Sequence, residues 1–431
     1  MNSFNRRDFV KSAGAISIAG ATAGVGLSGC ASVGGAAKPK VVIVGGGFGG
    51  ATAAKYIAMW SEGKIDVTLV ERGSAFVSCP LSNLVLGGSK SIGDISVAYG
   101  GLDKYGIKRV QGEATGFNAD KKVLALADGT RLPYDRLILS PGIDFMLESL
   151  PGLASAEARG KVLAAWKAGP ETVALRNQLT AMKEGGVFAI HIPKAPFRCP
   201  PGPYERACQV AWYFQQAKPK SKVLILDANE DVVSKKGLFM AAWNGKFKGV
   251  VEYRNNQEIQ DVDAKTNTLK MTFGDDLRAD VLNVLPPMRA GNIATQNGLN
   301  NSNKRWCQID WLTYESTAVK NVHILGDSLQ IAPLMPKSGH MANQHGKVCA
   351  AAVVALLTGD VVSAASMVAN TCYSFIDDKN VVHVASVHRY DAAQKTMVTV
   401  AGAGGLSPSP NLAEGVYANS WAKNIWADML T

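Results

Sequence analysis

The chain has 431 residues, of which 47% are hydrophobic and 19% are charged. This is the composition of a globular protein and excludes an intrinsically disordered chain. The length is sufficient for two or three domains around a large buried core. The formal net charge is +10, yet no run of Lys or Arg is long enough to indicate nucleic-acid binding. The charge leaves two interpretations open, a solvated basic surface or an acidic partner protein.

The first 37 residues have the features of an export signal. Arg6 and Arg7 precede a weakly apolar segment rich in Ala and Gly, residues 12–29. A twin arginine in this position resembles a twin-arginine signal, which exports proteins that have already folded, and it predicts a periplasmic protein. The segment is too polar for a membrane span, so we expect no transmembrane segment. Processing stays open between cleavage that releases a soluble form and a lipid anchor on Cys30.

A dinucleotide-binding loop follows the first predicted strand, residues 41–44. Gly45 permits a tight turn, Gly47 lets the backbone approach a pyrophosphate, and Gly50 allows the next helix to pack closely on the strand. The pyrophosphate would then meet the free N–H groups at the helix N-terminus. The residues of this loop that we expect to bind the cofactor are Gly45, Gly47, Phe48 and Gly50.

Further segments indicate that the dinucleotide is FAD. The second strand ends at Glu71, about twenty residues after Gly50, where a carboxylate would bind ribose hydroxyls. Asp327 follows a late strand in a Gly-Asp pair, which resembles the ribityl-binding pair of flavoenzymes with two dinucleotide domains. We therefore predict one discontinuous FAD-binding domain, residues 38–150 and 291–358. The further residues expected to contact FAD are Glu71, Arg72, Ser140, Pro141, Gly142 and Asp327.

The middle segment, residues 151–290, has the order of a second Rossmann-like domain without a nicotinamide phosphate loop. Strands at 187–192 and 222–227 flank a helix predicted at 207–216. Prolines in the turn before that helix remove the backbone N–H groups that would hold phosphates, and Cys199 lies in the same turn. We expect that electrons enter through sulfur at Cys199 and not from NAD(P)H. A buried structural cysteine is the alternative.

Four other segments carry a resemblance to a known family. The chain resembles the flavoprotein subunit of flavocytochrome c sulfide dehydrogenase over essentially everything after the signal. The most specific segments are SCPLSN at 78–83, APFRCPPGPYER at 195–206, PLMPKSG at 333–339 and NTCYS at 370–374. They are much more specific than the glycine pattern alone.

This resemblance implies a role for each residue that it matches. Cys199 and Cys372 correspond to a redox-active disulfide beside the flavin, although they are far apart in the sequence. Cys79 corresponds to the cysteine that attaches FAD covalently, with Pro80 beside it as a departure from the family pattern. Glu205 corresponds to a proposed catalytic base, and a carboxylate complementing the helix dipole is its alternative role. Lys337 lies in the flavin-binding stretch. No role is assigned to Cys208, Cys307 and Cys349.

The predicted fold class is α/β, with the two Rossmann-like domains followed by a C-terminal α+β cap, residues 359–431. The cap is expected to contain strands at 381–387 and 397–400 and a helix that carries Trp421 and Trp426. The resemblance implies that it helps to seat a c-type cytochrome subunit. The chain has no Cys-x-x-Cys-His motif, so the haem would lie on another polypeptide. The six histidines have no metal-ligand spacing, and we expect no metal site.

The expected activity is oxidation of sulfide to sulfur or polysulfide, with electrons passing through FAD to the cytochrome. HS⁻ would attack the disulfide by thiol–disulfide exchange, and a cation would stabilise the departing thiolate; Arg198, Arg206 and Lys337 are the candidates. Three alternatives stay open: a membrane-associated sulfide:quinone reductase, an NAD(P)H-dependent reductase, and a flavin electron carrier without catalytic function.

Overall fold

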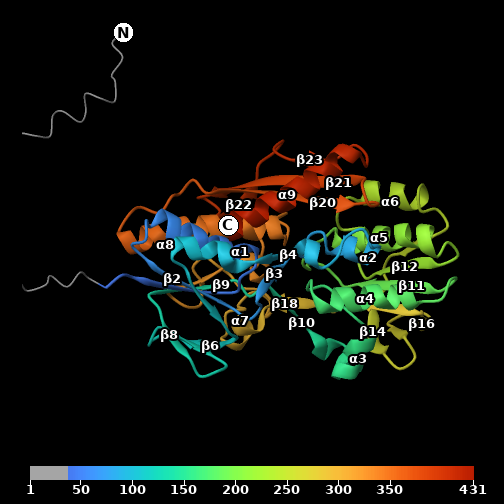
Figure 1. The fold of residues 1–431 in the computed structure, drawn as a ribbon, viewed down its shortest axis with the longest axis horizontal. Helices are drawn as coiled ribbons and strands as arrows, with labels where there is room; N and C mark the ends of the chain where they lie inside the picture. Colours follow the sequence, from blue (N-terminus) through green and yellow to red (C-terminus); the bar gives the residue numbers. More distant parts are fainter. Residues whose placement is uncertain (1–36) are drawn as a thin grey trace, which may run out of the picture. The chain divides into compact units, whose positions relative to one another are not determined.

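The structure is a computed structural model that describes residues 37–431 (Figure 1). Arg6, Arg7 and Cys30 lie outside the described residues, so the export signal and its processing stay predictions. Lys38–Thr431 forms one unit, and the following description concerns that unit.

The first sheet contains five parallel strands in the order β19–β9–β1–β2–β5. The central strands β1 and β9 are short apolar runs, as expected where both faces of a parallel sheet are covered. The late strand β19 pairs with β9, so segments from both halves of the chain form one sheet. The strands are β1 (Lys40–Val44), β2 (Asp66–Glu71), β5 (Lys108–Gln111), β9 (Arg136–Leu139) and β19 (Val322–Ile324).

Helices α1 (Phe48–Trp60) and α8 (Gly339–Thr358) lie side by side next to this sheet (Figure 1). A Cβ at Gly346 would come 2.5 Å from the carbonyl oxygen of Gly49, so glycine allows the two helices to approach closely. Smaller elements complete the domain: β3 (Ala75–Val77), α2 (Ser82–Gly87), β4 (Ser96–Ala98), β6 (Ala114–Asn118), β7 (Val123–Leu126), β8 (Arg131–Pro133) and α7 (Asn292–Gln296).

The central domain has a four-stranded parallel sheet in the order β13–β12–β11–β17 and an antiparallel sheet β14–β15–β16. An antiparallel pair, β10 with β18, lies where the chain leaves and re-enters the FAD domain. The strands are β10 (Ile143–Phe145), β11 (Val187–Ile192), β12 (Lys222–Asp227), β13 (Val251–Arg254), β14 (Ile259–Asp263), β15 (Thr268–Met271), β16 (Leu277–Arg278), β17 (Val281–Val284) and β18 (Met288–Ala290).

One helix boundary in this domain differs from the prediction. Helix α5 runs over Gly202–Ala217, whereas the sequence predicted a start at residue 207. Pro203 lies in the first turn, where its missing N–H is not needed and its fixed φ suits a helix. The helix therefore begins inside the proline-rich segment, three residues after Cys199. The other helices of the domain are α3 (Ala156–Lys161), α4 (Pro170–Ala181) and α6 (Lys236–Asn244).

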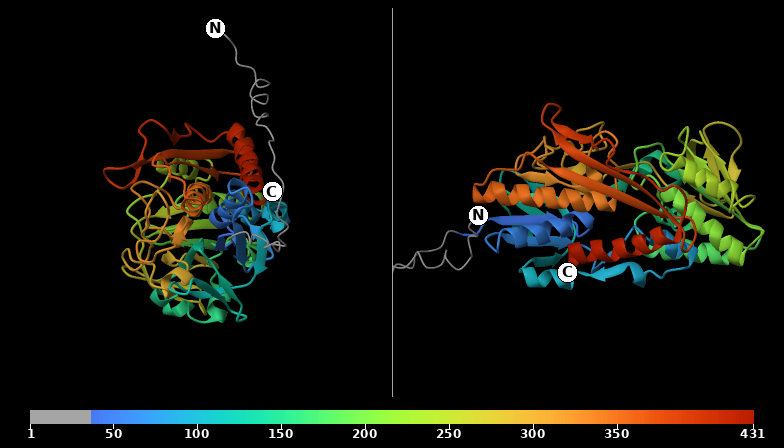
Figure 2. Two further views of the ribbon diagram at one scale, coloured as in Figure 1. Left: turned by 90° about the vertical axis from the view of Figure 1, so that its left-hand side faces the viewer. Right: turned by 90° about the horizontal axis from the view of Figure 1, so that it is seen from above.

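The C-terminal segment contains an antiparallel sheet and a long helix. Strands β20 (Met367–Phe375) and β21 (Val381–Asp391) pair along their length and extend from the FAD domain to the central domain (Figures 1 and 2). Strand β20 contacts both α8 and α5, so the segment bridges the two domains. The sequence analysis did not identify β20, which carries Cys372. The remaining elements are β22 (Thr396–Thr399), β23 (Gly405–Leu406) and α9 (Leu412–Leu430), the predicted C-terminal helix.

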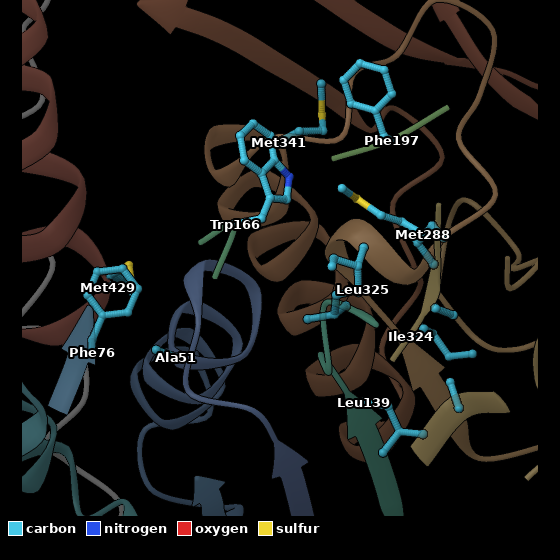
Figure 3. Packing of buried hydrophobic residues seen from close by; sticks show 14 of the residues in the cluster. Ala51, Phe76, Leu139, Trp166, Phe197, Met288, Ile324, Leu325, Met341 and Met429 are labelled. Atoms are coloured by element: carbon cyan, nitrogen blue, oxygen red, sulfur yellow. The ribbon is translucent and has the colours of Figure 1, made fainter. Parts of the chain in front are cut away.

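A single large hydrophobic cluster joins these parts. It includes Ala51 of α1, Trp166 and Phe197 of the central domain, and Met429 of α9. Figure 3 shows these four side chains with others of the same cluster. A second cluster, around Leu226, lies between the parallel and antiparallel sheets of the central domain. None of the helices within residues 37–431 has the length and apolar character that crossing a membrane requires.

Candidate active site

A cavity of about 980 Å³ lies where the three parts of the fold meet. Its size is at the upper end of the range for small-molecule and cofactor sites. The FAD domain contributes the loop between β1 and α1, the segment before α2, and the turn after β19. The central domain contributes the turn before α5, and the C-terminal segment contributes β20. The predicted site residues among its lining are Gly45, Gly47, Phe48, Glu71, Arg72, Cys79, Ser140, Pro141, Gly142, Cys199, Glu205, Asp327 and Cys372.

The glycine loop has the geometry that the sequence predicted. Gly45 has a φ of +97°, which side-chain-bearing residues rarely adopt. A Cβ at Gly50 would lie 1.9 Å from the carbonyl oxygen of Gly45, so only glycine fits there. A Cβ at Gly47 would meet nothing within 4 Å. Open space therefore lies at the N-terminus of α1, where a pyrophosphate would approach.

Glu71 ties the end of β2 to this loop. Its Oε2 accepts a hydrogen bond from the N–H of Gly46 at 2.6 Å, and its Oε1 accepts one from the N–H of Gly73 at 2.8 Å. The carboxylate lines the cavity, so it is in place to accept from ribose hydroxyls while it orders the loop. Ser140 lies beneath the loop, with its carbonyl oxygen 2.4 Å from the position of a Cβ at Gly45.

Asp327 provides the test of whether the residues present fit a flavin dinucleotide. Its carboxylate is buried at the cavity wall, and Oδ1 has no hydrogen-bond partner among the described residues. Burial raises the pKa of this carboxyl, while Arg198 and Lys337 lower it. Because buried polar atoms are nearly always hydrogen-bonded, this oxygen is suited to a ligand hydroxyl. Together with the open space at Gly47, it fits the ribityl chain and pyrophosphate of FAD.

Three of the six cysteines in the described residues line the cavity: Cys79, Cys199 and Cys372. They are partly buried, and all six are free thiols. The fold therefore brings Cys199 and Cys372 to one cavity from two different domains. The other three, Cys208, Cys307 and Cys349, are fully buried away from it. Cys208 belongs to the hydrophobic core, on α5.

Cys199 is held by its backbone. It has a φ of +57°, uncommon for a residue with a side chain. Its N–H donates to the carbonyl oxygen of Lys337 at 2.8 Å, and its own carbonyl oxygen accepts from the N–H of Gly202 at 2.9 Å. A Cβ at Gly202 would lie 2.9 Å from Cys199 Sγ. Glycine at the start of α5 therefore leaves the space that the thiol occupies.

Of the three cations predicted near the thiols, Arg198 and Arg206 line the cavity and Lys337 does not. Arg206 is buried and donates to Asn83, Asn283 and two backbone carbonyl groups, so it mainly joins the domains. Lys337 is not part of the cavity lining: its Nζ donates to the carbonyl oxygen of Asp327 at 2.9 Å and lies 3.6 Å from the centroid of the Trp306 ring. It supports the flavin-binding turn from behind.

Lys235 is a buried cation that the sequence analysis missed. It precedes α6 in the central domain, and its Nζ donates to the carbonyl oxygen of Cys372 at 2.7 Å and to Ser374 Oγ at 2.8 Å. No motif marks this lysine, and its partners lie more than a hundred residues away in the chain. Only the tertiary structure identifies it.

Glu205 lies in the first turn of α5 and faces the same cavity. Its Oε2 accepts from Asn83 Nδ2 at 3.0 Å, and its Oε1 accepts from the N–H of Phe375 at 3.0 Å. Burial raises the pKa of this carboxyl, against the lowering effect of these hydrogen bonds and of Lys235 and Arg206. A raised pKa suits a group that exchanges a proton near neutral pH.

Three family models match successive parts of the chain. Residues 39–173 match the pyridine nucleotide-disulphide oxidoreductase model. Residues 172–286 match the central part of the sulfide dehydrogenase (flavocytochrome c) flavoprotein chain, and residues 364–430 match the flavin-binding part of flavocytochrome c sulphide dehydrogenase.

Two curated relatives were compared in sequence. The sulfide dehydrogenase (flavocytochrome c) flavoprotein chain of Chlorobaculum thiosulfatiphilum is 59% identical over 46 residues, which are 94% of that sequence and 11% of this chain. The mitochondrial sulfide:quinone oxidoreductase of Dictyostelium discoideum is 25% identical over 298 residues, or 67% of this chain. The match spans 65% of that protein, slightly less than two thirds of its length.

Solved structures share the fold at low sequence identity. The sulfide:quinone oxidoreductase of Aquifex aeolicus has a TM-score of 0.71 at 15% identity and covers 91% of both chains. Putidaredoxin reductase in its covalent putidaredoxin complex has a TM-score of 0.63 at 18% identity and covers 90% of this chain and 93% of its own. These likenesses confirm the predicted α/β fold class.

Proposed function

This chain belongs to the family of the flavocytochrome c sulfide dehydrogenase flavoprotein chain, and from that premise we propose that it oxidises sulfide to sulfur or polysulfide through Cys199 and Cys372. Electrons pass through FAD to a c-type cytochrome on another polypeptide. The chain acts in the periplasm after twin-arginine export. Its family membership shows that it is a flavoprotein, and we propose the sulfide oxidation, the cytochrome acceptor and the export.

The observation that carries this proposal is the convergence of two distant cysteines on the FAD-type cavity. Cys199 from the central domain and Cys372 from β20 line the same cavity as Gly47 and Asp327. In the proposed mechanism these two cysteines form the redox-active pair, and HS⁻ reaches them through the cavity that they line.

The chain's own groups supply most of the proposed chemistry. HS⁻ attacks one sulfur of the oxidised pair, a new S–S bond forms, and the other sulfur departs as a thiolate. Glu205 exchanges a proton with the sulfur substrate. Cations near the cavity stabilise the departing thiolate. Bound FAD supplies the capacity to accept the electron pair and to release electrons singly.

The central domain supports the proposal that NAD(P)H is not the electron donor. Asp227 ends β12, at the place where a dinucleotide domain would bind a ribose. The side chain is fully buried, and its Oδ2 accepts hydrogen bonds from Tyr204 at 2.7 Å and Tyr253 at 3.2 Å. The tyrosines enclose this carboxylate.

Anaerobic sulfide titration with the flavin absorbance as readout tests the proposal. We expect bleaching in the wild type and its loss in Cys199→Ser and Cys372→Ser. Cys208→Ala, whose thiol is buried in α5 away from the cavity, should behave as wild type. A non-catalytic electron carrier would be unaffected by either serine, and bleaching by NAD(P)H but not by sulfide would overturn the proposal.

Sulfide:quinone reduction is the second candidate, favoured by the relatives with that activity in their names. The two candidates share the cysteine chemistry and differ in the acceptor. Steady-state assays with oxidised cytochrome c and with a quinone in lipid vesicles separate them. Turnover with quinone alone would replace the cytochrome assignment.

Covalent attachment of FAD through Cys79 is part of the proposal. Cys79 is partly buried at the cavity wall, with its Sγ 3.9 Å from the carbonyl oxygen of Trp166. The wild type should retain flavin fluorescence on a denaturing gel, and Cys79→Ala should lose it while Cys307→Ala keeps it. Release of free FAD from the denatured wild type contradicts covalent attachment.

Export is tested separately from catalysis. Replacing both Arg6 and Arg7 by Lys should retain the protein in the cytoplasm while leaving the flavin content of the folded protein unchanged. Cell fractionation reads out the location. Unchanged periplasmic recovery of the double variant contradicts the twin-arginine assignment.

A further inference from the structure

The proposed reaction leaves open which cysteine receives the sulfur of the substrate, and the surroundings of the two thiols differ. Cys372 Sγ accepts a hydrogen bond from Asn370 Nδ2 at 3.4 Å, and Ser338 Oγ donates to Asn370 Oδ1 at 2.5 Å. In residues 37–431 no comparable side-chain donor reaches Cys199 Sγ. A sulfur that carries negative charge is more stable where donors surround it.

Lys235 adds a positive charge on the same side. Its Nζ donates to the carbonyl oxygen of Cys372 at 2.7 Å and to Ser374 Oγ at 2.8 Å, and it lies 3.4 Å from the carbonyl oxygen of Val382. The residue is only 5% exposed and has a φ of +56°. Three acceptors in a buried setting hold the ammonium group in one place beside β20.

The charges facing this centre come from several elements. Glu205 of α5 is the carboxylate that acts on Lys235. The pKa of Lys235 is lowered to about 8 because the effect of burial exceeds the raising effect of Cys372, Glu205 and Cys199. Burial raises the pKa of both thiols, but Lys235 and Asn370 lower that of Cys372. Arg198 is the cation that lowers the pKa of Cys199.

Resting on the proposed function, we propose that Lys235 is a positioning residue that makes Cys372 the thiolate of the pair, so that Cys199 receives the sulfur atom. HS⁻ forms an S–S bond with Cys199 Sγ, the Cys199–Cys372 bond breaks, and its electron pair remains on Cys372. A second HS⁻ then attacks the outer sulfur of the Cys199 persulfide, which forms a new S–S bond between the two sulfide-derived sulfurs and leaves Cys199 as a thiolate. The Cys199–Cys372 bond would re-form when bound FAD takes up the electron pair of the two thiolates.

Thiol alkylation of the reduced holoenzyme tests the role of Lys235 without sulfide. Iodoacetamide reacts with thiolates, and mass spectrometry of the two peptides gives separate rates near neutral pH. Lys235→Gln keeps a hydrogen-bond donor but removes the charge, and a change of one pKa unit alters the thiolate fraction about tenfold. We expect Cys372 alkylation to fall by about that factor or more, with Lys235→Arg retaining most of the rate.

Lys246→Gln is the matched control. Lys246 also reaches from the central domain to the C-terminal hairpin, where it pairs with Asp377, but its side chain is half exposed and does not line the cavity. Both alkylation rates should stay at the wild-type values. Equal Cys372 rates in wild type and Lys235→Gln would overturn the proposed role of Lys235.

Mapping the sulfur in the wild type is a second measurement that needs no variant. The oxidised holoenzyme is mixed with sulfide, trapped with iodoacetamide and digested, and the extra sulfur is expected on the Cys199 peptide. Extra sulfur on Cys372 overturns the assignment. If no persulfide forms on either cysteine and sulfide does not bleach the flavin, the proposed function fails, whereas the alkylation rates still test Lys235.

Discussion

Glu205 is a residue for which burial and hydrogen bonding act in opposite directions. Desolvation disfavours its charged form, and the Asn83 amide and the N–H of Phe375 favour it. The net result is a raised pKa. Its position in the first turn of α5 also suits a carboxylate that complements the helix dipole. The two roles predict different pH behaviour.

We expect Glu205→Gln to slow flavin reduction by sulfide about 10²-fold at the top of the pH profile, because a general base is lost. The base works only when ionised, so the advantage of the wild type shrinks as the pH falls through the raised pKa. The ratio of wild-type to variant rates at each pH cancels the ionisation of sulfide itself.

Glu171→Gln is the control for a helix-start carboxylate, since Glu171 lies in the first turn of α4 and accepts from the N–H of Ala165 at 2.9 Å. It should change the free energy of unfolding without changing the pH profile. A rate ratio for Glu205→Gln that does not vary with pH favours the helix-dipole role over the base.

At the start of α1, Gly50 is needed for packing, whereas Gly47 is needed for cofactor binding. Gly50→Ala should lower the free energy of unfolding of the apoprotein by about 1–3 kcal/mol, because the added Cβ overlaps the carbonyl oxygen of Gly45. Gly47→Ala should change it by less than about 0.5 kcal/mol, yet reduce FAD binding, since its Cβ enters the space for the pyrophosphate.

Chemical denaturation and FAD titration in a Cys79→Ala background measure the two effects separately. Gly63→Ala does not serve as a control, because Gly63 has a φ of +71°. Gly237→Ala does, since a Cβ there meets nothing within 4 Å and the residue lies outside the cavity lining. Equal FAD affinity of Gly47→Ala and wild type contradicts the proposed approach of the pyrophosphate.

The C-terminal helix α9 depends on a lysine of α1. Lys55 is buried, and its Nζ donates to the carbonyl oxygens of Ala427 at 3.2 Å and Asp428 at 2.8 Å. Both carbonyl groups lie in the last turn, where helical partners become scarce; that of Ala427 also accepts from the N–H of Thr431 at 3.1 Å. Lys55→Met should therefore destabilise the protein by about 1.5–3 kcal/mol and speed amide exchange in α9.

Lys347→Met is the comparison for Lys55→Met. Lys347 pairs with the Asp428 side chain at 3.0 Å and is partly exposed, so its loss should cost about 0–1 kcal/mol. Denaturant unfolding and hydrogen exchange measure both variants. If both variants lose the same free energy of unfolding, the buried hydrogen bonds of Lys55 contribute no more than the partly exposed ion pair of Lys347.

For the whole unit, the cavity is lined by three segments that are far apart in the sequence. The glycine loop, the Cys199 turn and β20 all line it, so FAD should stabilise the domains together. In the Cys79→Ala variant, free FAD at about 100 times Kd should add about 2.7 kcal/mol to the free energy of unfolding.

Hydrogen exchange distinguishes global from local stabilisation by FAD. Amides of the glycine loop, of the turn before α5 and of β20 should all gain protection. Protection confined to residues 44–50 contradicts a cofactor that joins all three segments.

Features that depend on near neighbours in the chain follow from the sequence alone. The glycine pattern requires its backbone geometry because a Cβ at Gly45 or Gly50 would overlap the main chain. The apolar runs of β1 and β11 indicate strands buried on both faces. The start of α5 lies earlier than its sequence pattern predicts, because Pro203, a residue typical of turns, also suits a first helical turn. Strand β20 was missed because its polar residues, such as Asn370 and Ser374, are buried among partners from other elements.

Which distant groups meet depends on the fold and is not visible in the sequence. Cys199 and Cys372 were paired by resemblance, and the fold places both at one cavity. Lys337 was expected at the flavin, yet its ammonium group lies over Trp306 because buried carbonyl groups hold it there. Lys235 was absent from every motif, since a buried cation is recognised only by the acceptors around it. Local pattern determines backbone conformation, whereas charge and proton affinity depend on neighbours that only folding brings together.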